Sequence, residues 1–136
     1  MNPAAAEWLR KAEIDLDGVR RALLPLPLPN LELSAFHCQQ AAEKLVQALL
    51  VALGLAYPRG GSAGHDIGLA VRQIPAAHPL RDDAAALIAL TPWATAFRYP
   101  ADDPTPAAEP SAATELAAWL ARLEAMRDRV AASSTP

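Results

Sequence analysis

The chain has 136 residues, a formal net charge of −3, and 52% hydrophobic against 20% charged residues. This length fits one domain with its own core, and this composition excludes a disordered polyelectrolyte. The acidic balance excludes a generally basic nucleic-acid coat, although a local basic patch is compatible with it. With Cys38 as the single cysteine, an internal disulfide and a multi-cysteine zinc site are also excluded.

The sequence lacks the patterns of a secretory signal and of a membrane span. Residues 1–10 have no apolar core of the kind a signal peptide needs. The most apolar stretch, residues 45–56, is interrupted by Gln47 and is shorter than the ~20 residues that cross a bilayer. We therefore expect a cytoplasmic protein with no membrane partner.

The first predicted helix covers residues 5–24, and the second covers residues 31–53. Apolar residues in the first helix repeat at alternating spacings of three and four, which is typical of a helix packed on one side. The second helix is apolar most of the way round, which predicts a central helix with several neighbours. Gly54 is expected to end it.

Three further helices are predicted, over residues 67–74, over residues 80–90 and from Ser111 to about residue 130. Asp66 is placed to cap the first of them. No alternating pattern predicts strands, and prolines cluster between the helices. The predicted fold is therefore all-α, an up-and-down four-helix bundle with an additional short helix. It forms a single domain over residues 1–136, with a core of about 7–130 and a frayed tail of 131–136.

One polar stripe interrupts the second helix. It consists of His37, Gln40, Lys44 and Gln47. Long polar side chains on a nearly buried helix need hydrogen-bond partners. These partners can come from the chain itself, from the region around Arg98, from a ligand or from another protein.

Residues 36–44, Phe-His-Cys-Gln-Gln-Ala-Ala-Glu-Lys, followed by Ala-Leu-Leu at 48–50, resemble the helix motif of HEPN domains. These small helical bundles are named for higher eukaryotes and prokaryotes nucleotide-binding. Three other segments are similar to landmarks of the family, in the family's order: residues 8–16, 65–67 and 98–100. The resemblance covers most of the chain.

The resemblance implies a bundle of four or five helices, often a homodimer, and a nucleotide ligand. It also implies a minimal nucleotidyltransferase, encoded nearby, as the partner in a two-component, toxin–antitoxin-like module. In many such modules the HEPN protein is a toxin that cleaves RNA. Other members are described as nucleotide binders or as partners that present substrate to the transferase.

The ribonuclease branch of the family uses an Arg followed four to six residues later by a His, near a late helix. Metal-free RNA cleavage needs a base, an acid and a cation for the phosphorane. The late position here holds Arg98 and Tyr99 with no His after them. Two earlier pairs have the spacing, one across a Gly-rich loop and one across a proline: Arg59 with His65, and Arg72 with His78. The sequence therefore argues against an enzyme and assigns no catalytic residue.

The remaining candidates form a nucleotide- or partner-binding set. Arg98 offers a bidentate fork for phosphate and Lys44 a point charge. His37 and Gln40 can hydrogen-bond a base or sugar, and Tyr99 can stack or accept a modification. His37 and Lys44 lie about two turns apart, roughly 10 Å along one face, which suits the length of a nucleotide.

Each candidate also has a purely structural interpretation. The polar stripe can form an internal network, Arg98 can pair with Glu43, and Tyr99 can pack in a turn. We expect no cofactor and no metal. Three functions are left open: a non-catalytic nucleotide- or transferase-binding protein, an RNase toxin with an unusual active site and RNA as its substrate, and a structural or adaptor bundle without a ligand.

Overall fold

The computed structural model describes residues 2–56, 66–93 and 112–133, and all regular secondary structure within them is helical. The predicted all-α class is confirmed. The three long helices are α1 (Pro3–Ala22), α2 (Leu31–Ala52) and α6 (Ala113–Ser133). The short ones are α3 (Ile67–Val71), α4 (Arg81–Ala86) and the 3₁₀ helix η2 (Leu87–Leu90).

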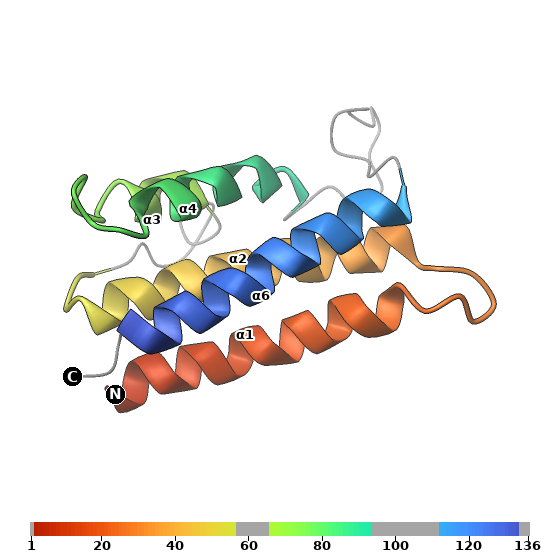
Figure 1. Ribbon diagram of the computed structural model, residues 1–136, viewed down its shortest axis with the longest axis horizontal. Coiled ribbons are helices and arrows are strands. Elements are labelled where there is room, and N and C mark those ends of the chain that lie inside the picture. The colour runs from red at the N-terminus through yellow and green to blue at the C-terminus, as the bar shows by residue number, and fades with distance from the viewer. Residues whose placement is uncertain (1, 57–65, 94–111, 134–136) are drawn as a thin grey trace.

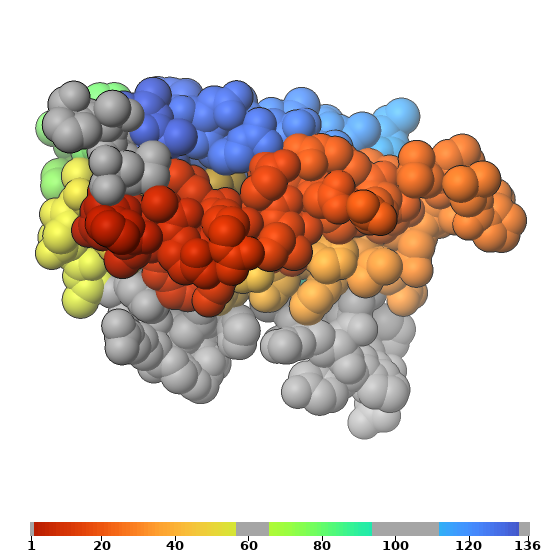
Figure 2. All heavy atoms as spheres, turned by 90° about the horizontal axis from the view of Figure 1, so that it is seen from below, coloured from red at the N-terminus to blue at the C-terminus, as the bar shows by residue number. Residues whose placement is uncertain are grey.

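The three long helices run side by side, and the short helices lie over α2 and α6 on the side away from α1 (Figure 1). Together, α3, α4 and η2 occupy the fourth position of the bundle. Viewed from below, α1 lies in front, with α6 along one side and α2 along the other (Figure 2). The loop after α1 projects from one end and carries two highly exposed leucines, Leu26 and Leu28, at 80% and 77%.

Among the described helices, α1 and α2 make the most extensive contact. Both helices bury alanines completely at this contact and in the adjoining core: Ala5, Ala12, Ala35, Ala41, Ala42 and Ala48. Because a methyl group takes little room, two alanine-rich faces allow short distances between helix axes. Larger side chains from three helices, among them Leu16, Leu45 and Leu123, complete the core.

Two of the predicted helix ends have the capping residues expected from the sequence, Asp66 and Gly54. The side chain of Asp66 accepts a hydrogen bond from the backbone N–H of Leu69 at 3.2 Å, as expected of an N-cap. Gly54 has a φ of +73°, a conformation that glycine adopts without strain, and it ends α2 as predicted.

Several predicted boundaries were wrong. Helix α1 covers Pro3–Ala22 and not residues 5–24, and α3 ends at Val71 and not at residue 74. Residues 80–90 form α4 and then η2, and not one continuous α-helix. The backbone tightens after Ala86, where the buried side chains Leu87 and Leu90 are three residues apart, the period of a 3₁₀ helix. At the other end of the chain, α6 continues to Ser133, so residues 131–133 of the expected frayed tail are helical, with Ser133 Oγ donating to the carbonyl of Val130 at 2.9 Å.

Candidate functional site

A buried carboxylate joins two candidate residues of the polar stripe. Asp15 lies on α1 and is 5% exposed. Its Oδ1 is 2.8 Å from Nδ1 of His37, and its Oδ2 accepts a hydrogen bond from Nζ of Lys44. Both partners come from α2, seven residues apart on one face. The predicted proximity of His37 and Lys44 is thus realised through a residue of another helix.

The contact with Asp15 determines how the His37 ring is used. An ionised carboxylate can only accept hydrogen bonds, so Nδ1 must carry a proton and donate. In the neutral ring, Nε2 is then an acceptor, and in the charged ring it becomes a second donor. A buried carboxylate therefore fixes both the tautomer and the orientation of the imidazole.

Gly18 of α1 provides the space in which the His37 ring lies. A Cβ atom at position 18 would lie 2.7 Å from both Cγ and Cδ2 of the ring, which is closer than real contacts allow. The ring also meets Phe36 edge-on, with centroids 5.6 Å apart. Gly18, Phe36 and Asp15 together leave the ring little freedom to rotate.

His37 and Lys44 reach the surface while the carboxylate does not. The side chains of His37 and Lys44 are 24% and 25% exposed, against 7% for Asp15. An ammonium group has three N–H donors, and Asp15 uses one, so Lys44 can still donate to a ligand oxygen. We refer to Asp15, Gly18, His37 and Lys44 as the α1–α2 site.

Gln40 belongs to a neighbouring network. Its Nε2 donates to Oε1 of Gln39 at 2.6 Å, and Nε2 of Gln39, a fully buried residue, donates to Glu43 at 3.1 Å. These bonds satisfy the buried amide of Gln39, as a buried polar group requires. Gln39 and Gln40 thus have the internal partners that the structural interpretation expected, although Gln40 lies between His37 and Lys44 in the helix. The side-chain oxygen of Gln47, the last residue of the stripe, is buried and has no hydrogen-bond partner among the described residues.

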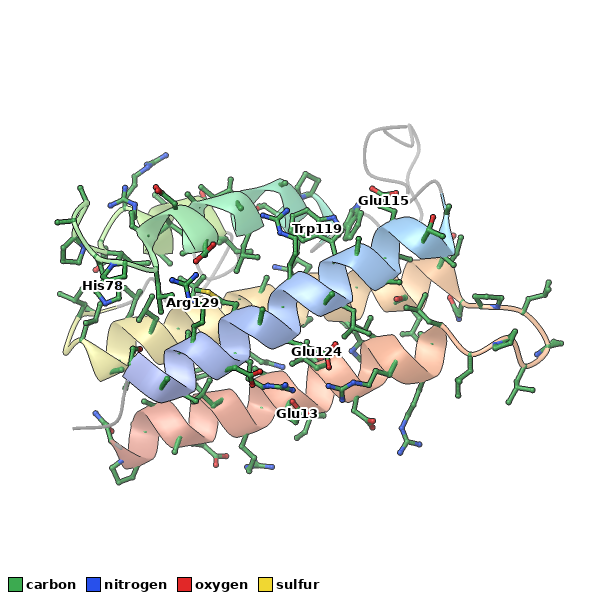
Figure 3. The ribbon with its side chains drawn as sticks, in the orientation of Figure 1. Glu13, His78, Glu115, Trp119, Glu124 and Arg129 are labelled. Atoms are coloured by element: carbon green, nitrogen blue, oxygen red, sulfur yellow. The ribbon has the colours of Figure 1, made fainter. Side chains whose placement is uncertain are left out.

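Two candidate residues, Arg98 and Tyr99, lie outside the described residues, as does the pair Arg59 and His65. The other pair with ribonuclease-like spacing is described. Arg72 ends α3, and Nδ1 of His78 accepts a hydrogen bond from the backbone N–H of Leu80 at 3.1 Å, so His78 caps a turn at one end of the bundle (Figure 3).

The described residues contain no group of three or more His, Cys, Asp or Glu side chains arranged to hold a metal ion. Within the same ranges, each helix is too short or too polar to cross a membrane. Cys38 is buried on α2, and burial raises the pKa of its thiol to about 12, so the thiol stays protonated at neutral pH.

An ion-pair network between α1 and α6 supports the helix that carries Asp15 (Figure 3). Arg20 donates to Glu13 and to Glu124, at 3.0 Å in both cases, and Arg127 donates to Glu13 at 2.5 Å. Burial opposes the charge on Glu13, but the hydrogen bonds from Arg127 and Arg20 outweigh it and lower the pKa of Glu13. Hydrogen bonds to Glu13 and Glu124 raise the pKa of Arg20.

Asp15 and Gly18 are not among the site residues predicted from the sequence. A signal for Asp15 was present, because it lies three residues after Ala12 and four before Val19, in register with the apolar face of α1. A carboxylate at such a position needs a partner in the core. No comparable signal marked Gly18, since its role depends on a ring from another helix.

The structure is a small helical bundle in which a buried carboxylate contacts a histidine and a lysine that reach the surface. In a comparison with known families, the HEPN domain matches residues 5–129. The chain therefore belongs to the HEPN domain family, as its motifs predicted. Neither the curated proteins nor the solved structures contain a match to it.

Proposed function

We propose that this chain is a non-catalytic HEPN protein that binds the phosphate groups of a nucleotide at the α1–α2 site. The observation that carries the proposal is the contact of both His37 and Lys44 with the buried carboxylate of Asp15. The negative charge of Asp15 balances the positive charge of Lys44. Because Asp15 is buried, it does not occupy the surface at which a ligand would bind. It leaves Nε2 of His37 and the remaining N–H donors of Lys44 at the surface, where a ligand can bind them.

The charge balance of the α1–α2 site predicts that it acts together with a second cation. Asp15 and Lys44 cancel, so with a neutral His37 the site has no net charge. A nucleotide phosphate would gain from a further guanidinium, and Arg98 of the family-like Arg-Tyr-Pro segment is our candidate. Tyr99 beside it is the candidate for stacking on a base or for modification.

Titration of the full chain with ATP by isothermal calorimetry tests this function. We expect saturable heat for the wild type, and about tenfold weaker binding for Lys44→Gln, as the loss of one charge-assisted hydrogen bond predicts. Arg98→Gln is expected to weaken binding as well. Arg10→Gln is the matched control, because Arg10 is an exposed cation that pairs with Glu7 on its own helix. Absence of heat, or equal affinity of wild type and Lys44→Gln, would refute nucleotide binding at this site.

The partner assignment rests on family membership. We infer a homodimer that associates with a minimal nucleotidyltransferase. The exposed leucines Leu26 and Leu28 support this inference, because exposed apolar side chains are often covered by a partner protein. Light scattering should give twice the 14.4 kDa chain mass. The neighbouring reading frame should encode a short protein with Gly-Ser followed by paired Asp residues, and the two proteins should co-elute after co-expression. Monomeric behaviour, or separate elution of the two, would contradict the respective inference.

A second function, metal-independent RNA cleavage, is favoured by one specific observation. The Asp15–His37 hydrogen bond has the arrangement in which a carboxylate orients a general base, with Nε2 as the acting nitrogen. Incubation of purified protein with RNA in EDTA separates the two functions. Cleavage that His37→Gln abolishes would replace the non-catalytic proposal, whereas intact RNA together with ATP binding would support it.

A further inference from the structure

A pocket lies on the opposite side of α6 from the Glu13 network, between α6 and the layer of short helices. Its volume is about 130 Å³. Figure 3 shows Trp119 and Arg129 along the edge of α6 that faces this layer. The pocket is lined by Asp83 and Leu87 from the short helices and by Arg122, Ala125, Met126 and Arg129 from α6.

The residues of α6 in this pocket form one stripe with a cation at each end. Arg122 and Arg129 are seven residues apart, about two turns, and the apolar Ala125 and Met126 lie between them. Leu87 faces these from η2. Apolar side chains therefore lie between the two arginines, and Asp83 pairs with Arg129 at one end.

The two arginines differ in how their charge is balanced. Arg129 pairs with Asp83 and is also directed at the carbonyl of Pro79, at 3.5 Å. The guanidinium of Arg122 instead lies over the ring of Trp119, 4.6 Å from its centroid. Within the described part of the chain, no carboxylate pairs with Arg122. Stacking on an indole limits its motion and leaves its N–H edge available to an anion.

We propose that this pocket binds a small carboxylate whose apolar part is no larger than a benzene ring. The carboxylate pairs with Arg122, and the apolar part lies on Leu87, Ala125 and Met126. The size limit follows from the volume, because the pocket, at about 130 Å³, is somewhat smaller than the apolar cavity of about 150 Å³ that accommodates benzene. This site shares no residue with the α1–α2 site, and the ligand it selects differs from a nucleotide in size.

Benzoate is the probe, with benzyl alcohol as its uncharged counterpart of similar size and inorganic phosphate as an anion without an apolar part. The Met126 methyl group reports binding in NMR spectra, since Met1 is the only other methionine. We expect a saturable shift with benzoate, and binding about tenfold weaker for benzyl alcohol, the value for one charge-assisted hydrogen bond. Phosphate should leave the Met126 signal in place.

Variants assign the effect to the pocket. Arg122→Gln should weaken benzoate about tenfold and leave benzyl alcohol unchanged. Ala125→Leu, at an exposed helical position that tolerates leucine, should occupy the pocket and abolish both. Arg10→Gln on α1 should change neither, and circular dichroism checks that each variant is folded. The proposal is overturned by a missing benzoate shift, by equal affinity for benzoate and benzyl alcohol, by a phosphate shift of equal size, or by unchanged benzoate binding in Arg122→Gln.

Discussion

Nδ1 of His37 lies 2.8 Å from Oδ1 of Asp15, so a carboxylate buried on α1 orients a surface-reaching ring on α2. The two residues are 22 positions apart in the chain. The orientation of the ring therefore depends on how α1 packs against α2. Any substitution that changes this packing is expected to change the candidate site as well.

Gly18→Ala should destabilise the protein although alanine is the better helix former. The new methyl group would overlap the His37 ring, which must move away from Asp15. Overpacking costs about 1 to 3 kcal/mol, against a gain of about 1 kcal/mol in helix propensity, so we expect a net loss of about 1 kcal/mol in the free energy of unfolding. Urea denaturation monitored by circular dichroism measures it.

A double variant isolates the cause. In a His37→Ala background the ring is absent, so Gly18→Ala should become stabilising by about 1 kcal/mol. This reversal of sign is specific to a clash with the ring. Destabilisation of equal size in both backgrounds would show that position 18 acts through something other than His37.

Asp15→Ala should be among the more damaging single substitutions on α1. It removes the acceptor of two hydrogen bonds, both from groups that are cationic or can become so, and leaves His37 and Lys44 three-quarters buried without it. Hydrogen bonds to charged groups contribute about 1.5 to 3 kcal/mol each, and the partners can partly regain water, so we expect a loss of about 2 kcal/mol. Asp15→Asn keeps the shape and one acceptor oxygen and should lose less. Chemical denaturation in which Asp15→Ala matches the wild type would contradict a structural role for the carboxylate.

Acid should weaken the contact between α1 and α6. Because folding lowers the pKa of Glu13 below its ordinary value of 4.5, the ionised carboxylate stabilises the folded state above pH 4.5. This stabilisation is lost as the pH falls through the lower pKa of the folded state. The difference in unfolding free energy between wild type and Glu13→Gln should therefore be largest near neutral pH and shrink below about pH 4.5.

Glu7→Gln is the control for this pH dependence. Glu7 also pairs with an arginine, but both are exposed on one helix, where water and salt screen the pair. Its substitution should give a smaller difference at every pH. A Glu13→Gln difference that stays constant down to the lowest pH would exclude the ion-pair network as its source.

Cys38 should be unreactive while the protein is folded. Burial raises the pKa of its thiol to about 12, and the thiolate is the reactive form. We expect negligible labelling by iodoacetamide near pH 8 in buffer and complete labelling in concentrated urea, both followed by mass spectrometry. Rapid labelling in buffer would mean that α2 separates from its neighbours under native conditions.

Periodicity predicted α1 and α6 well because each buries a continuous apolar face. Leu9 and Leu16 mark that face in α1, and Leu116 and Leu123 mark it in α6. The break between α4 and η2 was not predictable, since alanine-rich residues 84–90 suit either helix type. Packing of Leu87 and Leu90 against the core decides the outcome there.

The candidate site was only partly predictable. His37 and Lys44 share a face by helix geometry alone, which the spacing revealed. The choice of Asp15 as their common partner depends on the register of α1 against α2, and periodicity within one helix carries no information about register. Gln40 illustrates the same limit, because it shares the face of His37 and yet bonds to its own neighbour Gln39.

The first turn of α1 and the last turn of α6 lie at the same end of the bundle, while the α1–α2 loop projects from the other end (Figure 1). A circularly permuted chain, with a linker after α6 and new ends within the leucine- and proline-rich loop, should therefore fold. In that chain α1 would follow α6, so Asp15 would come after His37 in the sequence and not before it. The loop is thus a place to attach fluorophores or surfaces at a distance from the shared end of α1 and α6.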